Sequence, residues 1–175
     1  MYYADIKYPD IANGLGVRVS LFVSGCRRHC PECFNKEAQD FKYGSIFTDK
    51  EVKRIEDYLK LPQVSGLTLL GGEPMEPENR IQLLPLCRYF KEHYPEKSIW
   101  CYTGYLFDDE LVKESKQNTV LRLFLQYIDV MVDGPFINDL KDISLRFKGS
   151  SNQRIIDVQK SLQENKVVLY ELPNN

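Results

Sequence analysis

Three cysteines stand close together near the start of the chain. Cys26, Cys30 and Cys33 follow a Cys-x3-Cys-x2-Cys spacing, and no fourth cysteine lies nearby in the sequence. Cysteine thiolates bind iron–sulfur clusters, and a cubane cluster normally takes one cysteine for each of its irons. Three cysteines therefore predict a [4Fe-4S] cluster with one iron open to a ligand that is not protein. Zinc follows the same logic, since catalytic sites keep an open position and structural sites do not.

The remaining cysteines, Cys87 and Cys101, leave an alternative open. Either one could be the fourth ligand of a structural zinc site or of an ordinary ferredoxin-type cluster. Both lie in segments that are typical of packing positions, where a free cysteine behaves as a small hydrophobe, so we expect them in the core. His29 lies between two cysteines and beside Arg27 and Arg28, and we expect it to face solvent rather than bind metal.

Three other unusual segments each follow an expected strand. They are Gly71-Gly72-Glu73-Pro74, Thr103-Gly104 and Asp133-Gly134-Pro135. In parallel α/β folds the loops at the carboxyl ends of the strands form the active site, so these segments should lie around the same pocket as the cysteines. Glycines let the backbone approach a ligand, and a carboxylate accepts from an ammonium group. Taken alone, the glycine pair is more often a simple strand-to-helix turn, and Thr103 and Asp133 could equally cap turns.

The elements that must position these residues alternate between strands and helices. β-branched and apolar runs predict strands over residues 17–23, 66–70, 98–102 and 128–132. Helical spacing predicts helices over 49–60, 77–94 and, with Asp108 as a possible cap, 108–127. The alternation favours a parallel α/β sheet with right-handed crossovers.

Some local signals are sharper than others. Thr48 and Glu51 have the form of a capping box at the start of the first helix. Pro85 must either kink the second helix or lie in its first turn. Residues 144–157 are polar, and residues 167–170 could form a last short strand.

Composition bounds the class of protein. With 175 residues, of which 43% are hydrophobic, the chain can bury one sizeable core, so we expect a single domain over residues 1–175. A formal net charge of −2 gives no general attraction to nucleic acid or an anionic membrane. The sequence lacks an apolar run of about 20 residues and a secretory signal, and its five cysteines suit a reducing compartment, so we expect a cytoplasmic protein.

Taken together, the motifs resemble those of the radical S-adenosylmethionine superfamily. More closely, the chain is similar to the activating enzymes of anaerobic ribonucleoside-triphosphate reductases. The resemblance covers most of the chain and is carried by residues 10–18, 22–26, 33–36, 71–74, 100–105, 132–136 and 148–154. Two positions depart from wider patterns. Glu32 precedes the third cysteine where many superfamily members have an aromatic residue, and Glu73 stands where some activating enzymes have Asp.

The resemblance implies a fold and a set of cofactors. A full eight-fold barrel takes about 250 residues, so a partial (β/α) barrel of about five or six mainly parallel strands is expected here. One [4Fe-4S] cluster would be bound by Cys26, Cys30 and Cys33. S-adenosylmethionine would be held by Glu32, Cys33, Phe34, Gly71, Gly72, Glu73, Pro74, Thr103 and Asp133.

The resemblance also implies an activity. S-adenosylmethionine would be cleaved reductively to methionine and a 5′-deoxyadenosyl radical, which takes a hydrogen atom from a glycine of the large reductase subunit. The electron would come from a donor such as flavodoxin or ferredoxin. A small domain with few covering segments would let the foreign glycine loop reach the radical. No side chain has to act as a general base, which agrees with the lack of a convincing catalytic dyad.

Two other functions remain open at this point. One is a radical enzyme that acts on a small molecule, as in deazapurine biosynthesis, although the segment that begins at Lys148 favours the activating enzymes. The other is a non-catalytic iron–sulfur or zinc module. We expect Asn152, Gln153 and Arg154 either to contact the reductase or to form a polar loop. Among the aromatic residues, Tyr102 and Tyr105 could line the pocket, whereas we expect Trp100 in the core.

Overall fold

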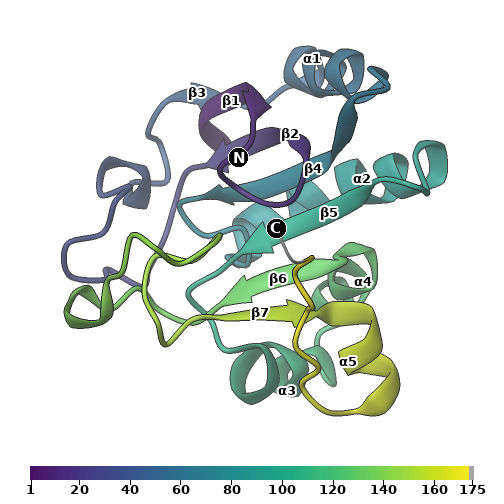
Figure 1. Ribbon diagram of the computed structural model, residues 1–175. Coiled ribbons are helices and arrows are strands. Elements are labelled where there is room, and N and C mark those ends of the chain that lie inside the picture. Colours follow the sequence, from purple (N-terminus) through teal and green to yellow (C-terminus); the bar gives the residue numbers. More distant parts are fainter. Residues whose placement is uncertain (174–175) are drawn as a thin grey trace.

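One open sheet organises the chain. The computed structural model describes residues 1–173, and its seven strands run in the order β3-β1-β2-β4-β5-β6-β7 without closing into a barrel (Figure 1). The strands are β1 (Tyr2–Asp10), β2 (Val17–Val23), β3 (Ser45–Ile46), β4 (Val64–Gly71), β5 (Ser98–Tyr102), β6 (Val130–Asp133) and β7 (Arg154–Asp157). The predicted α/β class is confirmed.

The centre of the sheet is parallel and its margins are antiparallel. Strands β2, β4, β5 and β6 pair in parallel, whereas β1 pairs antiparallel with β2 and β3, and β7 pairs antiparallel with β6. The sheet therefore has seven strands where five or six were predicted, and half of its pairings are antiparallel. The difference lies at the margins, because hairpin-like additions there need no crossover helix.

The helices cover one face of the sheet. They are α1 (Asp49–Leu59), α2 (Pro77–His93), α3 (Lys113–Ser115), α4 (Thr119–Tyr127) and α5 (Val158–Glu164). Residues that alternate along the strands divide between two cores. Leu21, Leu69 and Cys101 belong to the helix-covered core, whereas Trp100 and Val132 belong to the core on the opposite face.

Several local predictions are confirmed and one is corrected. Thr48 and Glu51 form the expected capping box of α1. Pro77 occupies the first turn of α2, and Pro85 lies inside that helix. The single helix expected over 108–127 is wrong, because a π-helical turn (Phe107–Val112) leads into α3, and α4 then begins at its own cap, Asn118.

The end of the chain was also mispredicted in part. The last strand expected over 167–170 is reduced to one bridge between Ile156 and Leu169. The polar stretch 144–157 ends instead in β7, and α5 follows it directly. Of the helices in residues 1–173, none is both long enough and apolar enough to cross a membrane.

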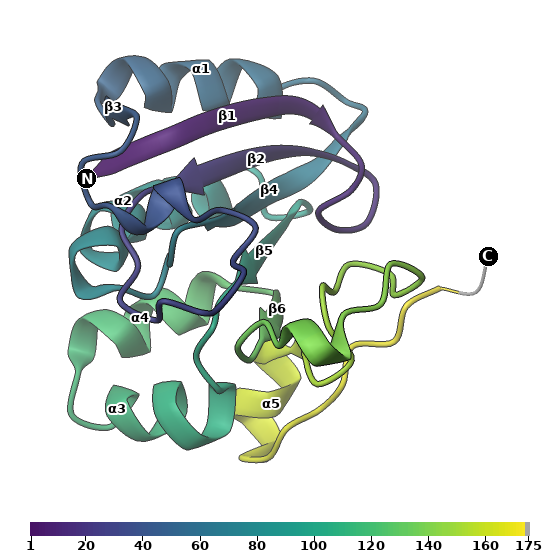
Figure 2. The ribbon, with the colours of Figure 1, turned by 90° about the vertical axis from the view of Figure 1, so that its left-hand side faces the viewer.

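Figure 2 shows the edge of the sheet at which the parallel strands end. The loop that follows β2 (blue) and the connection between β6 and β7 (green) both lie at this edge (Figure 2). The segments that the sequence singled out are therefore gathered on one side of the molecule, as the parallel topology requires.

A buried arginine holds the opposite ends of the same strands. The Arg18 side chain has no exposed surface, and its guanidinium donates to Thr68 Oγ1 at 2.6 Å and to the carbonyls of Leu67 and Ser98 at 2.8 Å. Its stem leaves no room for a side chain at Gly14, whose φ is +124°. Arg18 thus joins β2, β4 and β5 and fixes the loop between β1 and β2.

We expect Arg18→Met to destabilise the fold by about 3 kcal/mol, because five hydrogen bonds are lost and buried acceptors are left without donors. Urea denaturation of the apoprotein measures this loss. Arg88→Met, at an exposed position of α2, is the matched control and should change the free energy of unfolding by less than about 0.5 kcal/mol. Equal effects of the two substitutions would contradict the role given to Arg18.

Candidate functional site

A pocket of about 430 Å³ opens among the carboxyl ends of the parallel strands. It brings together most of the residues that the sequence predicted, namely Cys26, Cys30, Cys33, Phe34, Gly71, Gly72, Glu73 and Thr103. Tyr102 also lines it, as predicted. Four predicted residues are not part of this lining: Glu32, Pro74, Tyr105 and Asp133.

The cysteine loop begins at the end of β2. Its entry is fixed by backbone hydrogen bonds from Gly25 to Ala38, at 2.7 Å, and from Cys26 to Gln39, at 3.1 Å. His29 and Glu32 adopt positive φ angles of 47° and 54°, which non-glycine residues seldom do. The loop is therefore tightly curled, and the predicted exposure of His29 is confirmed.

All three thiols of the loop are free and half-buried. Burial raises the pKa of Cys26 to about 11, against the opposing effect of the backbone N–H groups of Arg28 and His29. Within residues 1–173, no three His, Cys, Asp or Glu side chains gather as the ligands of a single metal ion would. A cubane cluster makes a different demand, because each thiolate binds its own iron.

Cys87 and Cys101 lie away from this loop. Neither has exposed surface, and both pack in the helix-covered core, as predicted. Burial raises the pKa of both thiols. Each therefore behaves as a packed apolar group.

The glycine pair is required by the backbone of the cysteine loop. A Cβ atom on Gly72 would lie 2.7 Å from the carbonyl oxygens of Gly25 and Ala38. Hydrogen bonds from Gly72 N to Val23 O, at 2.7 Å, and from Glu73 N to Gly25 O, at 2.9 Å, join the two segments. The missing side chain at position 72 thus lets two strand ends touch.

Glu73 extends this contact to a third strand end. Its carboxylate is buried, with 1% of the residue exposed, and accepts hydrogen bonds from Met75 N at 2.9 Å and from Gly104 N at 2.8 Å. Burial raises the pKa of this carboxyl to about 7, although the two N–H donors and Thr103 act in the opposite direction. Glu73 therefore ties the end of β4 to the turn after β5.

Asn79 lies behind the same junction. Its buried amide donates to the carbonyls of Ser24, at 3.0 Å, and of Glu73, at 2.9 Å. One side chain of α2 thereby spans both loops. Asn79 is not among the residues predicted from the sequence, where its only signal is a polar residue in the first turn of a helix that follows the glycine pair.

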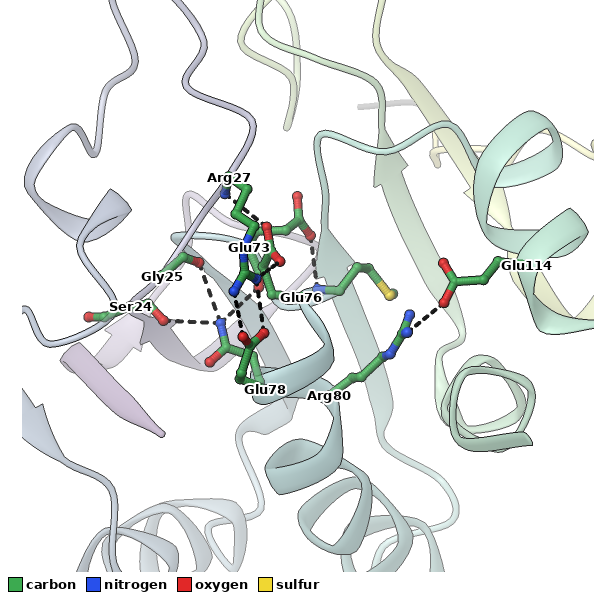
Figure 3. A network of polar contacts seen from close by, with 10 residues as sticks. Ser24, Gly25, Arg27, Glu73, Glu76, Glu78, Arg80 and Glu114 are labelled. Atoms are coloured by element: carbon green, nitrogen blue, oxygen red, sulfur yellow. Dashed lines mark hydrogen bonds and ion pairs between the residues drawn. The ribbon is translucent and has the colours of Figure 1, made fainter. Parts of the chain in front are cut away.

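An ion-pair network holds the outer side of the cysteine loop. Glu76, with 1% exposed, accepts from the backbone N–H of Arg27 at 2.8 Å and pairs with its guanidinium (Figure 3). The same guanidinium reaches Glu78, which is exposed. Arg28 pairs with Glu110 at 2.8 Å. Arg27 and Arg28 thus fasten the loop to two neighbouring segments.

Asp133 and Thr103 are engaged within the protein. Asp133 is fully buried, accepts from Phe107 N at 2.8 Å and pairs with Arg154, which also reaches Asp108. Thr103 accepts from Tyr105 N at 3.1 Å. The Asp133 carboxylate is therefore paired with Arg154 and does not face the pocket, although the next residue in the sequence, Gly134, lines it.

The β6–β7 connection, residues 134–153, forms another wall of the pocket. Gln153 Oε1 accepts from Gly149 N at 2.8 Å, and Gln153 Nε2 donates to Gly134 O at 3.0 Å. Asn152 donates to Pro135 O at 2.8 Å. The polar residues considered as partner contacts thus turn inward and shape this connection.

Substitution of Glu73 by Gln tests its buried state through the pH dependence of stability. A carboxyl whose pKa rises from 4.5 to about 7 on folding stabilises the fold below pH 4.5, and this contribution is lost as the pH rises through 7. The free energy of unfolding of Glu73→Gln, relative to wild type, should therefore increase by roughly 2 kcal/mol between pH 5 and pH 8. Urea denaturation of the apoprotein at both pH values measures it. A difference that does not change with pH would contradict the raised pKa.

Glu76→Ala should release the cysteine loop. The Arg27 amide loses its buried acceptor, so we expect its hydrogen exchange to become at least tenfold faster. Mass spectrometry of the peptide that contains residue 27 measures this rate. Glu78→Ala, which removes an exposed partner of the same guanidinium, is the control and should leave the rate within twofold of wild type. Equal acceleration by the two substitutions would show that Glu76 has no special part.

Comparison with known proteins identifies the family. Residues 12–156 match the model of a 4Fe-4S single cluster domain, which supports the predicted [4Fe-4S] cluster. The anaerobic ribonucleoside-triphosphate reductase-activating protein of Pasteurella multocida (strain Pm70) is 41% identical over 157 residues, covering 89% of this chain and 96% of that protein.

Two further relatives carry the same name. The protein of Enterobacteria phage T4 is 39% identical over 152 residues, covering 86% of this chain and 91% of its own length. The protein of Escherichia coli (strain K12) is 40% identical over 149 residues, covering 83% of this chain and 92% of its own length. The chain therefore belongs to the family of anaerobic ribonucleoside-triphosphate reductase-activating enzymes.

Proposed function

We propose that this chain installs a glycyl radical in an anaerobic ribonucleoside-triphosphate reductase. Activating enzymes of this family use a [4Fe-4S] cluster and S-adenosylmethionine. The observation that carries the proposal is the pocket in which three free thiols face the glycine-pair segment. When bound, the cluster and S-adenosylmethionine together supply the 5′-deoxyadenosyl radical that takes a hydrogen atom from a glycine of the reductase.

Cys26, Cys30 and Cys33 would hold the cluster. The thiols are free, half-buried and placed on a curled loop, and all three face one pocket. A set of three would leave one iron of a cubane without a protein ligand and so available to S-adenosylmethionine. The pocket volume of about 430 Å³ lies within the range of small-molecule sites.

The other predicted residues would position S-adenosylmethionine. Gly71, Gly72 and Glu73 line the pocket beside the cysteines, and Thr103 lines it from the next strand. Phe34 offers an aromatic surface at the mouth, where it is 65% exposed. Glu32, Pro74 and Asp133 adjoin these residues in sequence and would act by positioning them, since the three do not line the pocket themselves.

The chain's own task would be to orient the cofactor and to admit the substrate. Proximity alone supplies much of the catalysis when reactants are held in the right geometry. The reductase would enter at the open side of the pocket. Among the described residues, none that follows Gln153 in the sequence lines the pocket, so the end of the chain does not cover it. The electron would come from a small donor such as flavodoxin or ferredoxin.

The remaining predictions about the whole molecule are part of this proposal. Residues 1–175 would act as a single domain, because one sheet runs through strands from both ends of the chain. The open sheet would correspond to the partial barrel of the wider superfamily. We propose a cytoplasmic location, in which the thiols stay reduced.

Cysteine substitutions test the proposal. Any one of Cys26→Ala, Cys30→Ala and Cys33→Ala should abolish cleavage of S-adenosylmethionine by the anaerobically reconstituted, reduced protein, because the cluster loses a ligand. Release of 5′-deoxyadenosine, measured by chromatography, gives the rate. Cys87→Ala and Cys101→Ala are the matched controls and should keep cleavage, since both thiols are buried in the core.

Electron paramagnetic resonance separates the possible activities. The wild type with reductase, reductant and S-adenosylmethionine should produce a glycine-centred doublet on the reductase. A cluster spectrum that does not respond to S-adenosylmethionine would indicate an electron carrier instead. Cleavage without any organic radical on the reductase would indicate a small-molecule enzyme.

A further inference from the structure

The outward side of the β6–β7 connection exposes three large apolar side chains, with polar and charged residues between them in the sequence. Among residues 1–173, ten large hydrophobic side chains are exposed, and three of them fall within residues 137–143. Ile137 is 40% exposed, Leu140 is 41% exposed and Ile143 is 94% exposed. Single exposed apolar residues are ordinary, whereas three on one segment of seven residues are a surface that a protein partner could cover.

The polar residues of the same connection leave this surface uncovered. Ser151 N donates to Leu140 O at 2.8 Å, which closes the segment back on itself. Gln153 and Asn152 bond to backbone groups on the inner side. Hydrogen bonding thus fixes the connection from within, while the side chains of Ile137, Leu140 and Ile143 are exposed to solvent.

The inner side of the connection is continuous with the pocket. Phe136, Leu145 and Phe147 line the pocket from this segment. The ring of Phe136 lies 4.8 Å from that of Phe34, the exposed aromatic residue of the cysteine loop. One segment therefore has its inner face in the pocket and its outer face in solvent beside the pocket mouth.

We propose that Ile137, Leu140 and Ile143 form the docking surface for the reductase segment that carries the target glycine. This inference rests on the proposed function, because it takes the reductase as the partner. A small molecule inside the pocket cannot contact side chains on the outer face, whereas a protein partner covers about 800 Å² on each side. A polypeptide that covers this outer face is placed beside the mouth through which its glycine must enter.

Substitution on the outer face tests the proposal. Leu140→Asp, Ile143→Asp and the double variant should weaken binding of the reductase at least tenfold, because a charge replaces apolar contact. Isothermal titration calorimetry with purified reductase measures the affinity. Ile81→Asp places the same charge on α2, where the residue is 53% exposed, and should leave the affinity within twofold of wild type.

Two activity measurements accompany the titration. Dithionite-driven cleavage of S-adenosylmethionine without reductase should stay within twofold of wild type in every variant, since the substituted side chains lie outside the pocket. The glycyl radical on the reductase should be lost at low reductase concentration and recovered at high concentration. Recovery distinguishes weakened docking from a damaged site.

Four results would overturn the docking surface. They are unchanged reductase affinity in the double variant, loss of cleavage without reductase, a defect confined to flavodoxin-driven cleavage, and sedimentation that shows only loss of self-association. A wild type that binds reductase but does not cleave S-adenosylmethionine would instead overturn the proposed function. The affinity of the variants would still decide the docking surface.

Discussion

The site depends on how closely two backbones approach each other. Strands β2 and β4 pair in parallel register up to Val23 and Gly71, and beyond them Gly72 lies against Gly25 with no space for a side chain. Only at this distance can Glu73 N reach the carbonyl of Gly25 and Asn79 reach both segments. Position 72 therefore sets the separation between the cysteine loop and the residues opposite it.

Most of the parallel core could be predicted from the sequence because its signals are local. The strand at 17–23 and the capped helix at 49–60 are defined by alternation, helical spacing and one cap. Strands β1 and β7 could not be, since a marginal antiparallel strand is defined by its partner rather than by its own pattern. The site divides for the same reason. The three cysteines could be predicted because their motif is contained in eight residues, whereas Asn79 could not, because its role depends on a carbonyl that is distant in the sequence.

This geometry places two carboxyl groups in the protein interior. Glu73 and Glu76 are both buried near the pocket, and removal of such groups from water is costly unless hydrogen bonds replace the lost hydration. Two backbone N–H groups serve Glu73, and Arg27 serves Glu76 through its backbone and its guanidinium. A fully bonded polar network specifies one arrangement more strictly than apolar packing does, and here it fixes three strand ends relative to one another.

The single tryptophan of the chain lies where two otherwise unrelated segments meet. Arg18, which carries the loop between β1 and β2, stands 5.5 Å from the ring of Trp100, and Phe147 and Tyr170 contact the same ring edge-on. Its indole is therefore an intrinsic fluorophore for the core on the face of the sheet opposite the helices. Emission from this one residue reports, without any label, whether the early loop and the late segments are seated together in solution.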